Sequence, residues 1–182
     1  MEIYTDEHGS KFYYNSDNKL HRDKKDPITG LTLPAFIYFN GDEFWFKNGQ
    51  RHRDDRDSIT GLTLPACLYS NGDKEWWING QRHRTDLDEF GYTLPAAEYY
   101  NGTKFWYINN NPRRDERDPT TGYTLPACEY ANRTKKWFKN GVYHRDDIDP
   151  ITGIILPAII WFDETETKEW WINGIQYIYI NI

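Results

Sequence analysis

The chain has 182 residues, a formal net charge of -6 and an aromatic content of 17%. The negative charge argues against nucleic acid and anionic membranes as partners, because both attract basic proteins. No segment approaches the roughly 20 apolar residues of a membrane-spanning helix. Residues 1–6 lack the basic and apolar regions of a signal peptide, so we expect an intracellular, cytoplasmic protein.

The tripeptide Leu-Pro-Ala recurs along the chain at a spacing of 30 or 31 residues, which is typical of a repeat array. Its prolines are Pro34, Pro65, Pro95, Pro126 and Pro157. A matching segment precedes the first copy, so the chain divides into six units. Their approximate bounds are 1–32, 33–63, 64–93, 94–124, 125–155 and 156–182. The units run end to end without a linker, and we expect one elongated repeat domain.

Each unit begins with two β-rich runs joined by a turn. Asn-Gly predicts a hairpin at Asn40-Gly41, Asn71-Gly72 and Asn101-Gly102, because a type I′ turn needs positive φ at both central residues. Before the turn, alternation places Phe36 and Tyr38 on one apolar face. After it, we expect the constant Trp, for example Trp45, to face inward and pack against that Tyr.

The residue before the constant Trp is charged in three units, as Glu75, Lys136 and Glu169, so we expect that face to meet water there. Cys67 and Cys128 share one core position two units apart. With strands about 4.8 Å apart they lie beyond disulfide reach, and reduced thiols are expected.

In an antiparallel meander the chain runs in its starting direction again only after an even number of strands. Two strands per unit fit this requirement. The sequence therefore predicts an all-β fold, an elongated single-layer antiparallel β-hairpin array of about six units. A β-solenoid with one coil per repeat is the alternative.

A polar connection follows the second run, from His-Arg to Asp-Pro-Ile-Thr-Gly. We expect each Arg to pair with the Asp four residues later and the histidine to cap a strand end or donate to a carbonyl. The expected pairs are Arg22 with Asp26, Arg53 with Asp57, Arg84 with Asp88, Arg114 with Asp118 and Arg145 with Asp149. Histidines of neighbouring units would lie about 10 Å apart, too far for one metal ion.

No catalytic constellation stands out, because active sites are singular whereas repeat positions are duplicated for packing. The sequence has no phosphate-binding loop, dinucleotide fingerprint or zinc spacing. We therefore expect no enzymatic activity, no cofactor and no metal ion.

The order of motifs in a unit resembles the MORN-like β-hairpin repeat proteins of large DNA viruses (giant viruses) and some bacteria. The motifs in residues 64–88 are Asn71-Gly72, Trp76-Trp77, Asn79-Gly80 and His83-Arg84. The resemblance implies an elongated ribbon that acts as a scaffold, in the virion or the host cytoplasm if the protein is viral. True MORN units are shorter and richer in Gly, so their lipid binding does not transfer.

Two functional hypotheses follow. The first is a non-enzymatic scaffold for protein-protein interaction, or a structural virion component. The second is a carbohydrate-binding module, because residues 102–107 resemble the aromatic repeats of cell-wall choline- or glucan-binding modules. We also expect the weakly charged run 175–182 to form an edge strand that pairs with another chain. The candidate interaction residues are Phe46, Trp77, Tyr107, Phe138, Trp171, Tyr177 and Tyr179.

Overall fold

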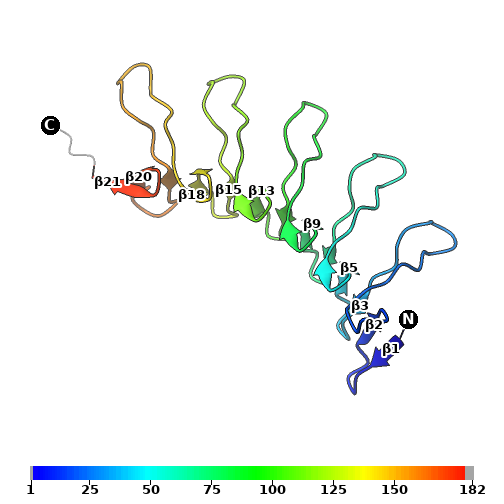
Figure 1. Ribbon diagram of the computed structural model, residues 1–182. Helices are drawn as coiled ribbons and strands as arrows, with labels where there is room; N and C mark the ends of the chain where they lie inside the picture. The colour runs from blue at the N-terminus through cyan, green and yellow to red at the C-terminus, as the bar shows by residue number, and fades with distance from the viewer. Residues whose placement is uncertain (1, 179–182) are drawn as a thin grey trace.

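The computed structural model describes residues 2–178, and every regular element in this part is a β-strand (Figure 1). Thirteen strands form one antiparallel sheet in chain order. They are β1 (Glu2–Thr5), β2 (Lys11–Tyr14), β3 (Phe36–Ile37), β4 (Glu43–Phe44), β7 (Cys67–Leu68), β8 (Lys74–Glu75), β11 (Ala97–Glu98), β12 (Lys104–Phe105), β15 (Cys128–Glu129), β16 (Lys135–Lys136), β19 (Ile159–Ile160), β20 (Lys168–Ile172) and β21 (Ile175–Tyr177). This confirms the elongated hairpin array, and its antiparallel pairing differs from the solenoid alternative.

Four small hairpins lie beside the large sheet, one in each of four successive units. They are β5 (Phe46–Lys47) with β6 (Gln50–Arg51), β9 (Trp77–Ile78) with β10 (Gln81–Arg82), β13 (Tyr107–Ile108) with β14 (Asn111–Pro112), and β17 (Phe138–Lys139) with β18 (Val142–Tyr143). These units therefore have four short strands where the sequence predicts two.

The chain passes from the large sheet into the small hairpin at the constant Trp. Trp45 N donates to the Ala66 carbonyl of the next unit at 2.8 Å, whereas the Trp45 carbonyl accepts from His52 N at 3.0 Å. Trp45 thus belongs to neither strand. The small hairpin then turns at Asn48-Gly49, with φ of 51° and 82°, which is type I′ geometry.

The first Asn-Gly of the unit also makes a hairpin turn, but of another kind. At Asn40-Gly41 only the glycine has positive φ, 94°. Tyr38 N donates to the Asp42 carbonyl at 2.8 Å, and Gly41 N donates to the Tyr38 carbonyl at 2.9 Å. The predicted hairpin is confirmed, and its turn is a three-residue loop closed by a left-handed glycine.

One face of the large sheet, which we call the aromatic face, carries the registered partners Phe36, Phe44, Cys67 and Glu75. Tyr69 packs against Phe44 on this face, with ring centroids 5.5 Å apart. The constant Trp has the opposite parity and lies on the other face. It is buried, as predicted, but the predicted packing of Trp against Tyr is wrong.

Glu75 is buried on the aromatic face and does not meet water as predicted. Its carboxylate accepts from Trp77 Nε1 at 2.8 Å and from Arg82 Nη2 at 2.9 Å. Its neighbours in the sheet are Cys67 and Ala97. These small residues leave room for the larger side chains to close over the carboxylate.

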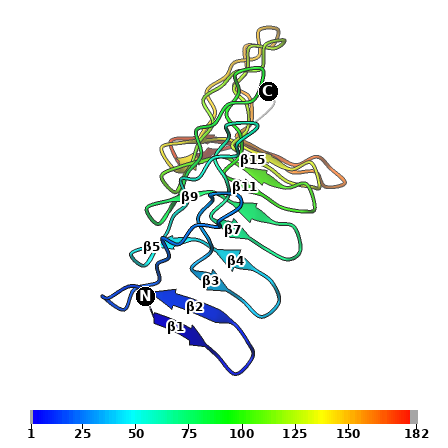
Figure 2. The same ribbon diagram turned by 90° about the vertical axis from the view of Figure 1, so that its right-hand side faces the viewer.

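Five projecting loops lie on the side of the constant Trp, and we define them as loop 1 to loop 5. They are residues 23–31, 54–62, 85–92, 115–123 and 146–154. Figure 1 shows that the units follow an arc and that the loops fan outward, with tips farther apart than bases. Figure 2 shows the hairpins of the large sheet side by side along the same ribbon.

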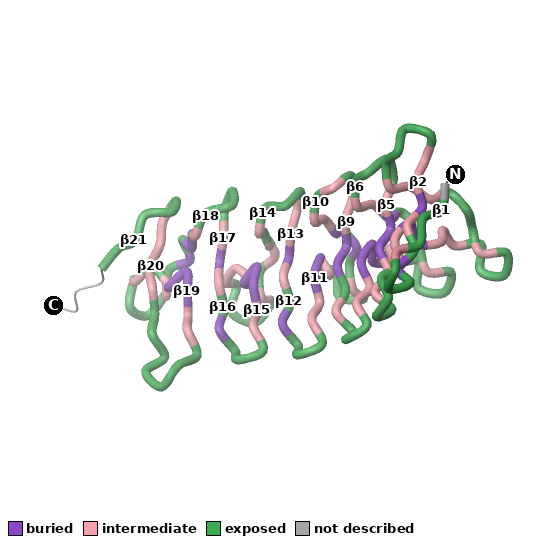
Figure 3. Tube along the Cα trace, turned by 90° about the horizontal axis from the view of Figure 1, so that it is seen from below, coloured by how far each residue is buried: buried purple, intermediate pink, exposed green. Residues whose placement is uncertain are grey.

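Buried residues form a stripe along the middle of the ribbon, between two exposed rows of turns (Figure 3). The alanines of the Leu-Pro-Ala tripeptides lie in this stripe without measurable exposure in most units. The core is therefore narrow and continuous, and it leaves the loops on the outside.

Candidate interaction surface

An arginine stacks on the constant aromatic residue in every unit that has a projecting loop. The guanidinium carbon of Arg53 lies 3.9 Å from the ring centre of Trp45. Arg53 Nη1 donates to the Pro65 carbonyl and Nε donates to Asp55, both at 3.1 Å. Burial lowers the pKa of Arg53, and the bond to Asp55 opposes that change. The equivalent stacks are Arg22 on Tyr13, Arg84 on Trp76, Arg114 on Trp106 and Arg145 on Trp137.

The predicted pairing of each arginine with the Asp four residues later is wrong. Arg53 pairs with Asp55, two residues later, and both side chains lie on the same side of an extended segment. Asp57 instead closes the loop tip, since its Oδ1 accepts from Ile59 N, Thr60 N and Thr60 Oγ1 at 2.8–3.0 Å. The other predicted pairs that fail are Arg22 with Asp26, Arg84 with Asp88, Arg114 with Asp118 and Arg145 with Asp149.

The acids that bind these arginines also tie neighbouring loops together. Asp86 accepts from the Thr63 amide at 3.0 Å and from the Thr63 hydroxyl, and Arg56 Nη1 lies 3.3 Å from its other oxygen. Burial alone would raise the pKa of Asp86, but the hydrogen bonds from Thr63 and Arg84 outweigh burial and the pKa is lowered. The bases of loops 2 and 3 are therefore braced against each other.

The histidines join the small hairpins of successive units. His52 Nδ1 accepts from Asn79 N, in the turn of the next unit, at 3.1 Å. Its Nε2 lies 3.3 Å from Asp54. A ring nitrogen that accepts an amide proton carries none itself, so the proton of a neutral His52 is on Nε2. His21 and His144 make equivalent contacts, which differ from the predicted donation to a carbonyl.

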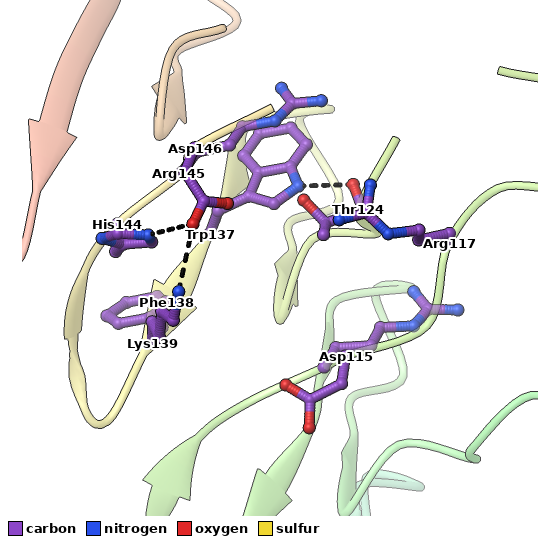
Figure 4. Close-up of a pocket in the computed structure, with 10 residues that line it drawn as sticks. Asp115, Arg117, Thr124, Trp137, Phe138, Lys139, His144, Arg145 and Asp146 are labelled. Carbon is purple, nitrogen blue, oxygen red and sulfur yellow. Dashed lines mark hydrogen bonds and ion pairs between the residues drawn. The ribbon is translucent and has the colours of Figure 1, made fainter. Parts of the chain in front are cut away.

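Clefts of related composition open beside the constant Trp of four successive units. The cleft between loops 4 and 5 has a volume of about 230 Å³, and Trp137 lies in its wall (Figure 4). Asp146 accepts from Lys139 Nζ in this cleft and lies 3.0 Å from His144 Nε2. The bonds from His144 and Lys139 lower the pKa of Asp146 to about 2. These charged groups neutralise one another within the protein.

Five of the seven residues predicted to form an interaction surface lie in one row and are half-buried. Phe46, Trp77, Tyr107 and Phe138 begin the small hairpins and contribute to the cleft walls, and Trp171 lies in β20. Their sequence positions therefore mark a real structural row.

Cationic and aromatic side chains cover the rings of this row. The guanidinium carbon of Arg51 lies 5.8 Å from the ring centre of Phe46 and 5.2 Å from that of Trp77. Arg82 lies in the same way between Trp77 and Tyr107, at 4.8 and 5.6 Å. The result is a row in which arginines alternate with rings, and two guanidinium groups lie against Trp77.

The structure places one of the two C-terminal tyrosines. Tyr177 ends β21 and is 51% exposed. Tyr179 lies outside the described residues, so the structure gives no placement for it.

The loop tips carry strongly exposed apolar residues, and the sequence analysis missed them. Ile28, Ile59 and Ile151 are each 92% exposed and Phe90 is 76% exposed. Each occupies the tip of its loop, beside an Asp that fixes the backbone. A signal was available, because an apolar residue recurs inside the otherwise polar Asp-Pro-Ile-Thr-Gly connection.

Both cysteines are buried free thiols, and burial raises the pKa of Cys67 and of Cys128 to about 12. Among residues 2–178, no three or more His, Cys, Asp or Glu side chains gather as metal ligands would. The same part of the chain has no helix of the length and hydropathy needed to cross a membrane.

The geometry presents two distinct surfaces, the covered aromatic row and the exposed loop tips. The resemblance to MORN-like proteins and the viral setting stay predictions. Comparisons with protein-family models, with curated proteins and with solved structures found no match for this chain.

Proposed function

We propose that the chain is a non-enzymatic repeat scaffold that binds another protein through its projecting loops. The observation that carries this proposal is the exposed apolar side chain at the tips of four loops. A side chain that is 92% exposed adds little to the stability of its own fold. Loop 4 has Thr120 in the same turn, so the turn itself does not require isoleucine.

The repeated polar side chains support this division of roles. Arg53, Asp55 and His52 are all used in contacts that hold units together. These contacts hold the loop bases at fixed spacing and leave the tips free to touch a partner. A scaffold needs this combination of a stiff frame and exposed contact residues.

Protein binding fits the structure better than carbohydrate binding. A sugar stacks on an open ring face, but Arg51 and Arg82 both lie over the Trp77 ring. Binding at that ring would require an arginine to leave its place. Self-association through an edge strand is a second proposed contact, and it rests on the exposure of Ile175, Gln176 and Tyr177 in β21. A structural role in a virion rests on the resemblance alone.

Site-specific photocrosslinking tests the proposed function. The photoreactive residue benzoylphenylalanine replaces Ile59 at a loop tip or, as a matched control, Tyr100 at an exposed hairpin turn. Expressed in its cell of origin, the chain should form protein adducts from position 59 and far fewer from position 100. Adducts confined to position 100, or none at position 59, would contradict binding through the loops.

A further inference from the structure

We infer that the partner of the projecting loops is a basic protein segment whose apolar side chains contact the loop tips. This inference rests on the proposed function and adds the chemistry of the partner. Three features of the described residues carry it: the charge of the loops, the ionised carboxylates at the tips and the geometry of the fan.

The acidic charge of the chain is concentrated on the loops. Loops 1 to 5 contain 14 Asp and Glu residues and four basic ones, Lys24, Lys25, Arg56 and Arg117, which gives a net charge of -10. Three of these acids are paired with Arg53, Arg84 and Arg145 at the loop bases, and counting these arginines with the loops gives -7. The whole chain has a net charge of -6, so the remainder is then net +1. The loop side therefore attracts a basic partner, whereas the sheet side does not.

A carboxylate accompanies each apolar tip. Asp57 lies two residues before Ile59, and its Oδ1 accepts the Ile59 amide. Hydrogen bonds from Thr60 lower the pKa of Asp57, so this carboxylate stays ionised well below neutral pH. Asp26, Asp118 and Asp149 have lowered pKa values for the same reason. Each of these tips presents an acidic group within reach of a partner's Lys or Arg.

The two kinds of group have complementary effects on binding. Ionised carboxylates at the tips, such as Asp57, steer a basic segment toward the loops and set the salt dependence. Exposed isoleucine and phenylalanine lose contact with water on binding, which supplies affinity that salt does not remove. A partner with both basic and apolar side chains uses both.

A lipid bilayer fits this surface less well than a protein segment. The tips lie on the outer side of an arc, so a flat surface cannot meet all of them together (Figure 1). The carboxylates beside the tips would also have to lose hydration at the lipid surface. A flexible segment can follow the arc from one tip to the next.

Fluorescence anisotropy with three labelled peptides tests this inference on the full chain. One peptide alternates Lys with Leu, one alternates Lys with Ser and one alternates Glu with Leu. We expect the Lys-Leu peptide to bind tightest, the Lys-Ser peptide to bind weakly and the Glu-Leu peptide not to bind. Raising the salt to about 0.15 M should weaken both basic peptides.

Variants then assign the binding to the loops. The variant I28S/I59S/F90S/I151S should weaken binding of the Lys-Leu peptide at least tenfold and leave the Lys-Ser peptide nearly unchanged. The control variant F39S/Y100S, which removes exposed aromatics from the hairpin turns, should bind like the unaltered chain. All these positions are exposed, and circular dichroism should show the same fold.

Three results would overturn the inference: no binding of the Lys-Leu peptide, equal binding by the tip variant, or binding of phosphatidylcholine vesicles in place of the peptides. The crosslinking experiment separates this failure from that of the proposed function. Adducts at position 59 on a neutral or acidic partner segment would refute only the basic partner. A lack of adducts at position 59 would refute binding through the loops altogether.

Discussion

At two junctions of the ribbon, an acid faces the stacked arginine of its own unit and the threonine that follows the loop of the preceding unit. We call this arrangement the clamp, and its acid differs between the two junctions. Between loops 2 and 3, Asp86 accepts from Arg84 Nε at 3.1 Å and from the Thr63 amide at 3.0 Å. Between loops 3 and 4, Glu116 accepts the Thr93 amide at 3.2 Å, while Arg114 Nε and Glu116 Oε2 are buried without a hydrogen-bond partner. The clamp is closed at Asp86 and open at Glu116. The two acids have the same charge, and we attribute the difference to the longer side chain of Glu116.

The contact made by histidine is also missing where the clamp is open. His83 Nδ1 is buried without a partner, whereas His52 Nδ1 accepts the Asn79 amide. The turn facing His83 is Asn109-Asn110 instead of Asn-Gly, and Asn110 Oδ1 accepts from Arg82 N at 2.7 Å. The junction between the third and fourth units is therefore the weak point of the ribbon.

The largest expected effect comes from removing the acid of the closed clamp. Asp86→Ala removes the partner of Arg84 Nε and the acceptor of Thr63. The buried Arg84 keeps Glu98 and the Pro95 carbonyl, so the free energy of unfolding should fall by about 3 kcal/mol. Glu116→Ala should lower it by only about 1 kcal/mol, because fewer hydrogen bonds are lost. Urea unfolding followed by Trp fluorescence measures both. Equal losses would contradict the comparison.

Shortening the acid of the open clamp should close it. In Glu116→Asp the carboxylate can reach Arg114 Nε and Thr93 together, which should raise the free energy of unfolding by about 1 kcal/mol. The matched control is Asp86→Glu, which should lower it by a similar amount. Destabilisation by both substitutions would mean that side-chain length is not the cause.

The two histidines should also contribute unequally to stability, with the larger contribution from His52. His52→Ala removes the acceptor of the Asn79 amide and should destabilise the chain by about 1 kcal/mol. His83→Ala removes a nitrogen that has no partner and should have a smaller effect. Hydrogen exchange adds a local measurement, because the Asn79 amide should exchange faster in the first variant. Faster exchange in both variants would argue against this assignment.

The contribution of Asp86 to the free energy of unfolding should disappear only at acid pH. The folded-state pKa of Asp86 is lowered, so its contribution is complete above the unfolded pKa and disappears as the pH falls through the folded value. The difference in urea midpoint between the unaltered chain and Asp86→Asn should therefore be constant from neutral pH to about pH 4 and shrink below it. Asp86→Asn should show a weaker fall over that lower range. An equal fall of the urea midpoint in both chains would mean that groups other than Asp86 cause the loss of stability.

The hairpins could be predicted from the sequence because their signals are local. Asn40-Gly41 and the alternation of Phe36 with Tyr38 sit within one unit. The break at Trp45 could not be predicted in this way, since the pattern continues into Phe46 without Gly or Pro. At Trp45 the amide continues the pairing of β4 with the next unit, to Ala66, but the carbonyl switches to His52 N of the small hairpin, and this switch ends the strand.

The partner of each arginine was also hidden in the sequence. In an extended segment the acids two and four residues after Arg53 point to the same side, so spacing alone cannot choose between Asp55 and Asp57. The choice is made by the loop tip, which uses Asp57 for its own amides. The exposed Ile59 was missed because a loop is expected to be polar.

The clamps have a consequence for the evolution of the chain. Each one joins only neighbouring units, for example Thr63 to Asp86, so a unit can be gained or lost without rebuilding a central core. Every added unit also brings one more loop tip. If several tips contact the same partner, the avidity of the ribbon grows with the number of units while each single contact stays weak. Duplication would then tune binding strength in discrete steps.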